Sequence, residues 1–198
     1  MANSDNTLLF HYFVAIMKDY IKYLLPYKKS FQTINLSRRE VVTLEKLVIN
    51  HLKVRDMSEL RDKFEGQAFL DNFLYKSIPI IGIQKYLKNT FIDFENISVD
   101  KFLSEIIIAD QVINIVMFGP NLPLIDINNV HPCIFIHSTE NSTLQLCGYA
   151  SSQIIKDNLL NIKKYGFGSK EAIKGNFYGF NHLIVFNSLS ELESLIKA

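Results

Sequence analysis

Apolar and aromatic residues at the start of the chain follow a helical pattern. They are dense from Leu8 to Leu25, and the polar residues at 3–5 can cap a helix there, so we predict a helix that ends at Pro26. One face would carry a stripe at helical spacing: Phe10, Phe13, Met17, Tyr20 and Leu24. The stripe favours packing into the core, and its alternative use is a seam for a homodimer or for another protein partner.

Three more helical segments follow in the first half. Residues 37–40 (Ser-Arg-Arg-Glu) have the spacing of a capping box, and the apolar positions after them predict a helix to about Leu52. Apolar spacing over 58–75 predicts a third helix. A short fourth helix is predicted over 80–87 after Pro79, because proline fits the first turn of a helix.

The second half changes to the pattern of β-strands. Four short runs are rich in β-branched residues and are bounded by Gly, Pro or Asn: 112–116, 124–127, 133–136 and 144–147. Turn-forming residues at 119–121 predict a hairpin between the first two runs. Those at 140–142 predict a hairpin between the last two.

The last fifty residues are predicted to mix helix and strand. Helical character returns from 151 to about 165, and residues 182–186 have the pattern of a closing strand. A C-terminal helix through Ile196 can be capped by Ser188 with Glu191, or by the same spacing two residues later.

Length and composition fit one globular unit. With 198 residues, 48% of them hydrophobic, the chain can bury a substantial core. We expect an α/β (α+β) fold in which a helical N-terminal portion, residues 1–78, packs on a mixed central sheet of about five strands within residues 79–198. The formal charge of +1 means that any basic surface must be local.

The cysteine content and the hydropathy pattern indicate the compartment. Cys133 and Cys147 are too few for a disulfide framework, so we expect reduced thiols and a cytoplasmic protein. The apolar run over 8–17 is too short to cross a bilayer, and we expect no membrane partner.

Two acidic residues accompany the first two predicted strands. Asp110 opens the first strand, and Asp126 lies inside the second, two residues before Asn128. This pattern resembles the paired acidic motifs of the PD-(D/E)XK, or restriction-endonuclease-like, nucleases. The flanking segments that share the resemblance are 79–87, 131–137 and 146–150.

The resemblance implies a restriction-endonuclease-like core in which Asp110 and Asp126 hold Mg²⁺, a hard cation that prefers oxygen ligands and activates water. Asn128 stands in the catalytic position where the family has a lysine, and Ile83 stands where it often has a glutamate. The implied protein is nuclease-like, of phage or bacterial type, and binds DNA in DNA metabolism or restriction with weakened or lost cleavage. Lys85 or Lys101 could supply a displaced cation.

Other interpretations of the same residues remain open. Asp110 can be a turn residue and Asp126 a solvated residue on a sheet edge. The protein can also be a non-enzymatic interaction or structural subunit that keeps the fold. A zinc site is a third hypothesis, and it would use His131, Cys133, His137 and Cys147.

The most basic segment contains the candidate nucleic-acid contacts. Lys163, Lys164, Lys170 and Lys174 alternate with aromatic residues between 165 and 180. Lysines pair with phosphates and exposed rings stack on bases, so this segment predicts binding to DNA. The alternative is a surface loop whose aromatic residues pack into the core.

Overall fold

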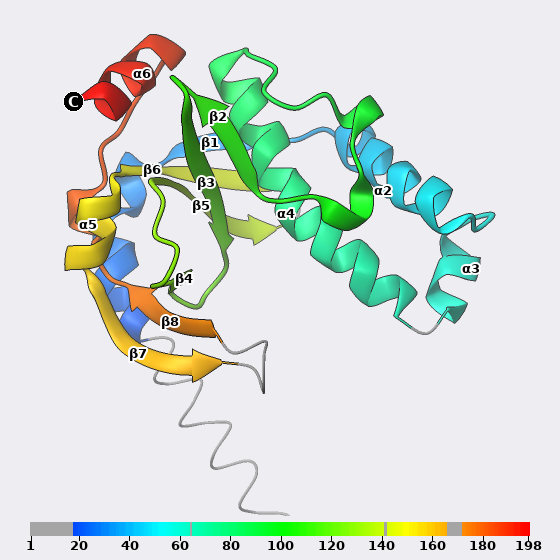
Figure 1. Ribbon diagram of the computed structural model, residues 1–198, viewed down its shortest axis with the longest axis horizontal. Coiled ribbons are helices and arrows are strands. Elements are labelled where there is room, and N and C mark those ends of the chain that lie inside the picture. The colour runs from blue at the N-terminus through cyan, green and yellow to red at the C-terminus, as the bar shows by residue number, and fades with distance from the viewer. Residues whose placement is uncertain (1–17, 64, 141, 166–171) are drawn as a thin grey trace, which may run out of the picture.

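The computed structural model describes residues 18–63, 65–140, 142–165 and 172–198, and it contains two β-sheets (Figure 1). The five-stranded sheet A has the order β1 (Gln32–Asn35), β6 (Thr143–Ala150), β5 (Cys133–Glu140), β3 (Gln111–Phe118) and β2 (Glu105–Ile108). Its strands pair antiparallel except β3 and β5, which are parallel. The predicted mixed sheet of about five strands is therefore confirmed.

The second sheet was not predicted. Sheet B has three antiparallel strands in the order β4 (Leu124–Asp126), β8 (Ala172–Phe177) and β7 (Leu159–Tyr165). It lies on the opposite side of sheet A from helices α2 (Arg38–Leu52), α3 (Met57–Asp62) and α4 (Gly66–Leu87) (Figure 1). The remaining elements are η1 (Tyr20–Leu24), η2 (Leu25–Ser30), η3 (Phe94–Asn96), η4 (Val99–Lys101), α5 (Ser152–Asp157), η6 (Phe180–His182) and α6 (Leu189–Lys197).

Two hydrophobic clusters enclose sheet A between them. Side chains alternate along β5, so that Ile134 and Ile136 join a cluster with helices α2 and α4, whereas Cys133 and Phe135 join a cluster with sheet B and α5. All four side chains are fully buried. Sheet A is therefore the central layer of the molecule.

Helix α4 runs through Pro79, so the predicted break between a third and a fourth helix is wrong. A proline inside a helix costs about 3 kcal/mol. Ile80 and Ile83 lie beyond it and are completely buried, and burying each contributes about 1.5–3 kcal/mol. Burial thus outweighs the cost of the proline. The expected boundary between the portions 1–78 and 79–198 falls within this helix.

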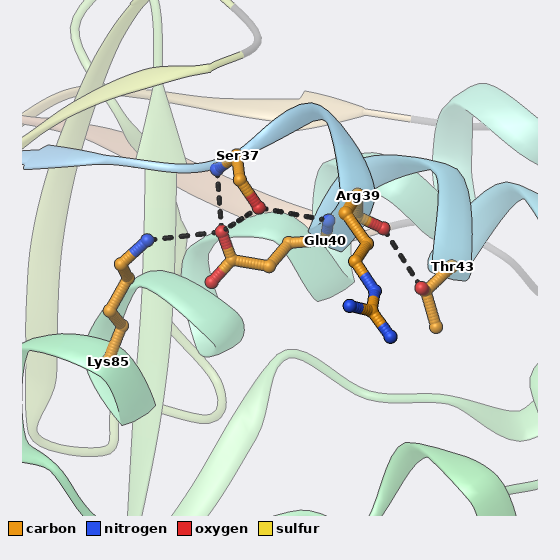
Figure 2. A network of polar contacts seen from close by, with 5 residues as sticks. All are labelled: Ser37, Arg39, Glu40, Thr43 and Lys85. Carbon is orange, nitrogen blue, oxygen red and sulfur yellow. Dashed lines mark hydrogen bonds and ion pairs between the residues drawn. The ribbon is translucent and has the colours of Figure 1, made fainter.

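The capping box predicted at residues 37–40 is confirmed, and it joins two helices (Figure 2). The Glu40 carboxylate accepts hydrogen bonds from the Ser37 backbone N–H and hydroxyl at 2.5 and 2.6 Å. The same oxygen lies 3.1 Å from Nζ of Lys85 near the end of α4. One carboxylate therefore ties the start of α2 to the end of α4.

Several connections differ from the prediction. The hairpin between β5 and β6 is present, but β3 and β4 do not form one, because the loop at 119–123 carries the chain from sheet A into sheet B. The helix predicted over 151–165 ends at Asp157, and its second half is strand β7. The predicted closing strand at 182–186 is reduced to a single bridge between Ile184 and Tyr149.

The chain ends follow the prediction in part. Helix α6 is capped by Ser188 as expected. Of the first predicted helix, Phe10, Phe13 and Met17 lie outside the described residues. The described end is a π-helix followed by a 3₁₀ helix that continues past Pro26. Within the described residues, no helix combines the length and apolar character that a membrane crossing requires.

We predict that Ser37→Ala lowers the free energy of unfolding by about 1 kcal/mol, because the amide of Glu40 loses its cap. Urea unfolding measures the difference. Thr43→Ala is the matched control: its hydroxyl also bonds within α2, to the Arg39 carbonyl (Figure 2), but alanine is the better helix former, so stability should not fall. An equal loss in both variants would contradict the capping role.

A second prediction concerns pH. Burial acts to raise the pKa of Glu40, but its hydrogen bonds to Ser37 and Lys85 outweigh burial and hold the pKa below its ordinary value. A depressed pKa contributes stability at pH values above the ordinary pKa, and this is lost as pH falls through the folded-state pKa. Wild type should exceed Glu40→Gln by about 0.5 kcal/mol at neutral pH and match it near pH 3. A difference that does not change with pH would refute this.

Candidate nucleic-acid interface

Sheet B has one buried and one open face. Ile125 and Phe177 belong to the second hydrophobic cluster, and Gly175, the strand partner of Ile125, is buried with them. The strand positions between them must point the opposite way, because side chains alternate along a strand. The outer face of sheet B is defined here by Leu124, Asp126, Leu160, Lys163, Tyr165, Lys174 and Asn176, all exposed or partly exposed.

A row of charged residues crosses this outer face. Lys174 on β8 is the direct strand partner of Asp126 on β4, and on its other side it is the partner of Lys163 on β7. Two lysines directly opposite one another repel. Within the described part of the chain, neither lysine forms an ion pair that would offset this repulsion. The row therefore carries two positive charges and one negative charge on the outer face of sheet B.

Apolar side chains stand beside the charged row. Leu160 is 55% exposed, and Leu124 and Tyr165 are also exposed. A β-bulge between Leu160 and Lys163 places Asn161 at φ 53°. Its side chain donates a hydrogen bond to the Tyr178 hydroxyl, which fixes the bulge. The bulge adds local twist, and Ile162 is left without a strand partner.

The four predicted nucleic-acid-binding lysines do not share one surface. Lys163 and Lys174 lie together on the outer face, as described above. Lys164 is the partner of Ile173, so it points to the other side of the sheet. Lys170 lies outside the described residues. Residues 159–165 and 172–177 form a strand pair and not the surface loop of the alternative interpretation, but Phe177 and Phe180 pack in the core as that alternative expected.

Asp110 does not open a strand but occupies the two-residue turn between β2 and β3. Ala109 and Asp110 have φ of 50° and 62°, the positive values that a type I′ hairpin requires. At the other end of this hairpin, Asn114 lines a hollow together with Asp126. Asp110 is four residues from Asn114, or about 13 Å along the strand. The register thus separates the two predicted metal ligands.

Asp126 and Asn128 do not share a strand face, because β4 ends at Asp126. The chain turns there, and the Asn128 backbone N–H donates to the Asp126 carboxylate at 2.9 Å. This is the local bond of an Asx turn. Asn128 itself is exposed. The nuclease family has a lysine at the position of Asn128. In this structure the lysine beside Asp126 is Lys174, its strand partner on β8.

A hollow of about 290 Å³ separates β4 from the β2–β3 hairpin, and it brings together oxygen-bearing side chains. Glu105, Asn114, Asp126 and Asn129 line it. Glu105 is not among the predicted site residues, although the β-branched run of Ile106 to Ile108 after it has a strand pattern that indicates its place on β2. Glu105, and not Asp110, is the acidic residue that shares a surface with Asp126.

Mg²⁺ can be held by one or two carboxylates when water and phosphate complete its shell. Glu105 and Asp126 have the right chemistry, but one Asp126 oxygen already accepts the Asn128 amide. No group of three or more His, Cys, Asp or Glu side chains is arranged for a metal within the described residues. The hollow thus offers two carboxylates, one of which is already engaged in the Asx turn.

The two lysines that could supply the displaced positive charge also lie elsewhere. Lys85 is the ion-pair partner of Glu40, as shown in Figure 2. Lys101 lines a different hollow, beside β2. Neither lies on the outer face of sheet B.

Three residues of the zinc hypothesis are packed in the core, whereas His131 is only half-buried, in the segment before β5. Cys133 and Cys147 are free and buried, and burial raises the pKa of Cys133 to about 12 and that of Cys147 further still. A metal binds the thiolate, which this environment disfavours. His137 is 3% exposed and contacts Gln145 through its ring nitrogen at 3.1 Å, and burial lowers its pKa.

The like-charge pair on sheet B gives a stability prediction. Replacing Lys163 by Glu puts an attractive pair opposite Lys174, so the free energy of unfolding should rise by about 0.5 kcal/mol at low salt. Lys163→Gln, which only removes the repulsion, should give a smaller rise. Both gains should shrink at high salt, because ions screen exposed charges. A gain that is independent of salt would show that repulsion is not its source.

The chain was compared with protein-family models, with curated proteins and with solved structures, and none of them matches it. The mixed fold is therefore established by the structure itself. The resemblance to restriction-endonuclease-like nucleases rests on the sequence patterns alone.

Proposed function

We propose that this protein binds nucleic acid, with DNA as the expected target, on the outer face of sheet B, and that it has little or no cleavage activity. The proposal rests on the pairing of β7 with β8, which places Lys163 directly opposite Lys174. A folded chain that keeps two lysines opposite each other gives up stability in the free state. Binding a phosphate between them recovers that stability.

The surroundings of the lysine pair support the same function. Phosphate contacts supply most of the affinity of sequence-independent binding, while apolar and aromatic surfaces contact the bases. Leu160 and Tyr165 are exposed on the same strand and the same face as Lys163. The net charge of the whole chain is only +1, so a local basic row has to provide the attraction.

Weak cleavage follows from the arrangement of the acidic residues. The turn that holds Asp110 is about 13 Å along the strand from the part of the hairpin that faces Asp126. Asn128 carries no charge, and it bonds back to Asp126. The expected nuclease machinery of Asp110, Asp126 and Asn128 would need a rearrangement of the hairpin before it could hold Mg²⁺.

Binding is tested with the double variant Lys163→Ala/Lys174→Ala. We expect the affinity for an oligonucleotide to fall and the slope of log affinity against log salt to shrink by about 1.4–1.8, the contribution of two phosphate contacts. Fluorescence anisotropy at several salt concentrations measures both. Lys46→Ala/Lys197→Ala is the matched control, because it removes the same charge from exposed positions on α2 and α6.

Two kinds of result would contradict the proposal. If both double variants lose affinity by the same factor, the protein responds only to net charge. If neither variant binds less tightly than wild type, or if wild type does not bind, the outer face of sheet B is not a nucleic-acid interface. In the latter case a non-enzymatic protein-interaction role, the alternative considered above, becomes the better account.

Cleavage is tested separately with supercoiled plasmid and Mg²⁺ or Mn²⁺. We expect no accumulation of nicked DNA under conditions where binding is complete. If nicking occurs, three variants identify its source. Loss of nicking in Glu105→Ala and Asp126→Ala but not in Asp110→Ala would assign it to the hollow beside β4 and would overturn the claim of weak cleavage.

A further inference from the structure

The outer face of sheet B is built of three rows of side chains that run across its strands. Residues that pair across β4, β8 and β7 stand in the same row, and residues two positions apart on β8 separate neighbouring rows by about 7 Å. The middle row holds the charges and consists of Asp126, Lys174 and Lys163. On one side of it stand Leu124, Asn176 and Leu160, and on the other side stand Ala172 and Tyr165. The charges therefore lie between two rows that carry exposed apolar side chains.

The positive charge of the middle row is concentrated toward one edge of the sheet. Lys174 lies between the other two members of the row, and β7, which carries Lys163, is the last strand of sheet B in the part of the chain that the structure describes. Neighbouring strands are about 4.8 Å apart, so Asp126 is two strand spacings, or roughly 10 Å, from Lys163. One Asp126 oxygen also accepts the Asn128 backbone N–H. A phosphate above the gap between β8 and β7 thus meets two ammonium groups and lies on the far side of Lys174 from the carboxylate.

Tyr165 offers a ring face next to this phosphate position. It stands two residues beyond Lys163 on the same face of β7, and it is 37% exposed. Its strand partner, Ala172, has only a methyl group and is too small to cover the ring. Other tyrosines near sheet B use their rings in packing, since Tyr23 and Tyr178 meet edge to face with centroids 4.5 Å apart. Among the described residues, the Tyr165 ring has no aromatic partner and its hydroxyl makes no hydrogen bond.

An exposed ring beside a phosphate position favours one form of nucleic acid. Stacking on an aromatic side chain needs the open face of a base, and in a duplex the neighbouring base pairs cover these faces. The rows also require unstacked bases, because the bases on either side of the phosphate lie over different rows, one at Tyr165 and one at Leu160. A duplex offers mainly its phosphates, and tight binding then draws on the order of 6–10 phosphate contacts. The outer face presents two lysines, which fits a single strand better.

We propose that the outer face of sheet B prefers single-stranded to duplex nucleic acid, with a phosphate between Lys163 and Lys174 and an adjacent base stacked on Tyr165. This preference rests on the function proposed above and specifies the form of its ligand. Leu160, which is 55% exposed on the opposite side of the lysines, is the apolar surface for the base on the other side of the phosphate. Because stacking and phosphate contacts use no base edges, the preference does not depend on the nucleotide sequence.

The preference is tested by fluorescence anisotropy with two matched probes. One is a labelled DNA strand of about 16 nucleotides without self-complementarity, and the other is the same strand annealed to its complement. At the same salt concentration, we expect wild type to bind the single strand about tenfold more tightly than the duplex. The reason is that one base stacked on an aromatic side chain contributes about fivefold or more to the affinity.

Three substitutions connect the preference to Tyr165. Tyr165→Leu removes the ring, so the affinity for the single strand should fall about five- to tenfold, while the slope of log affinity against log salt and the affinity for the duplex stay unchanged. Tyr165→Phe keeps the ring and should bind as wild type does. Tyr27→Leu is the matched control, because Tyr27 on η2 is also 37% exposed and lies outside sheet B. Thermal melting followed by circular dichroism checks that each variant is folded.

The outcomes separate this preference from the proposed function. Equal or tighter binding of the duplex, weakened by Lys163→Ala/Lys174→Ala, would overturn the preference for a single strand and leave the proposed interface in place. The same holds if Tyr165→Leu binds the single strand as tightly as wild type does, or if Tyr27→Leu loses as much affinity. A wild type that binds neither probe, or an affinity that is unchanged in the lysine double variant, would overturn both.

Discussion

Burial of both faces of sheet A is the constraint on which the rest of this structure depends. Strand β5 alternates its side chains between two clusters, one shared with α2 and α4 and one shared with sheet B. Complete burial contributes about 1.5–3 kcal/mol for each of Ile134, Phe135 and Ile136. A shift of one residue would exchange the two sets of side chains, so packing on both sides fixes the register.

Sheet B buries the face of sheet A that helices α2 and α4 do not cover. Phe177 stacks on Phe135 with ring centroids 4.5 Å apart, which attaches β8 to the centre of sheet A. Only one face of this small sheet is used for that contact. The other face stays open, and the register that follows from the packing of Phe177 and Ile125 places Asp126, Lys174 and Lys163 in one row. The candidate interface is therefore a consequence of how the core is covered.

The sequence predicted elements well where local chemistry decides them. The caps at Ser37 and Ser188, the hairpin between β5 and β6 and the central mixed sheet are all present. Long-range packing decided the rest. Pro79 is held inside α4 by its buried neighbours, and residues 159–165 form a strand because β8 pairs with them. Asp110 and Asp126 looked like a pair because the sequence does not show that β3 joins β5 and not β4. The sequence showed that the segment with Lys163 and Lys174 is basic. It did not show that the two lysines lie opposite each other on paired strands.

Hydrogen exchange with and without a single-stranded or duplex oligonucleotide tests the central claim most directly, because it locates the bound surface without any substitution. The account predicts slower exchange for backbone amides of β4, β7 and β8, with no change in α2 to α4. Protection confined to the helices, or no protection anywhere under conditions where anisotropy shows binding, would contradict it.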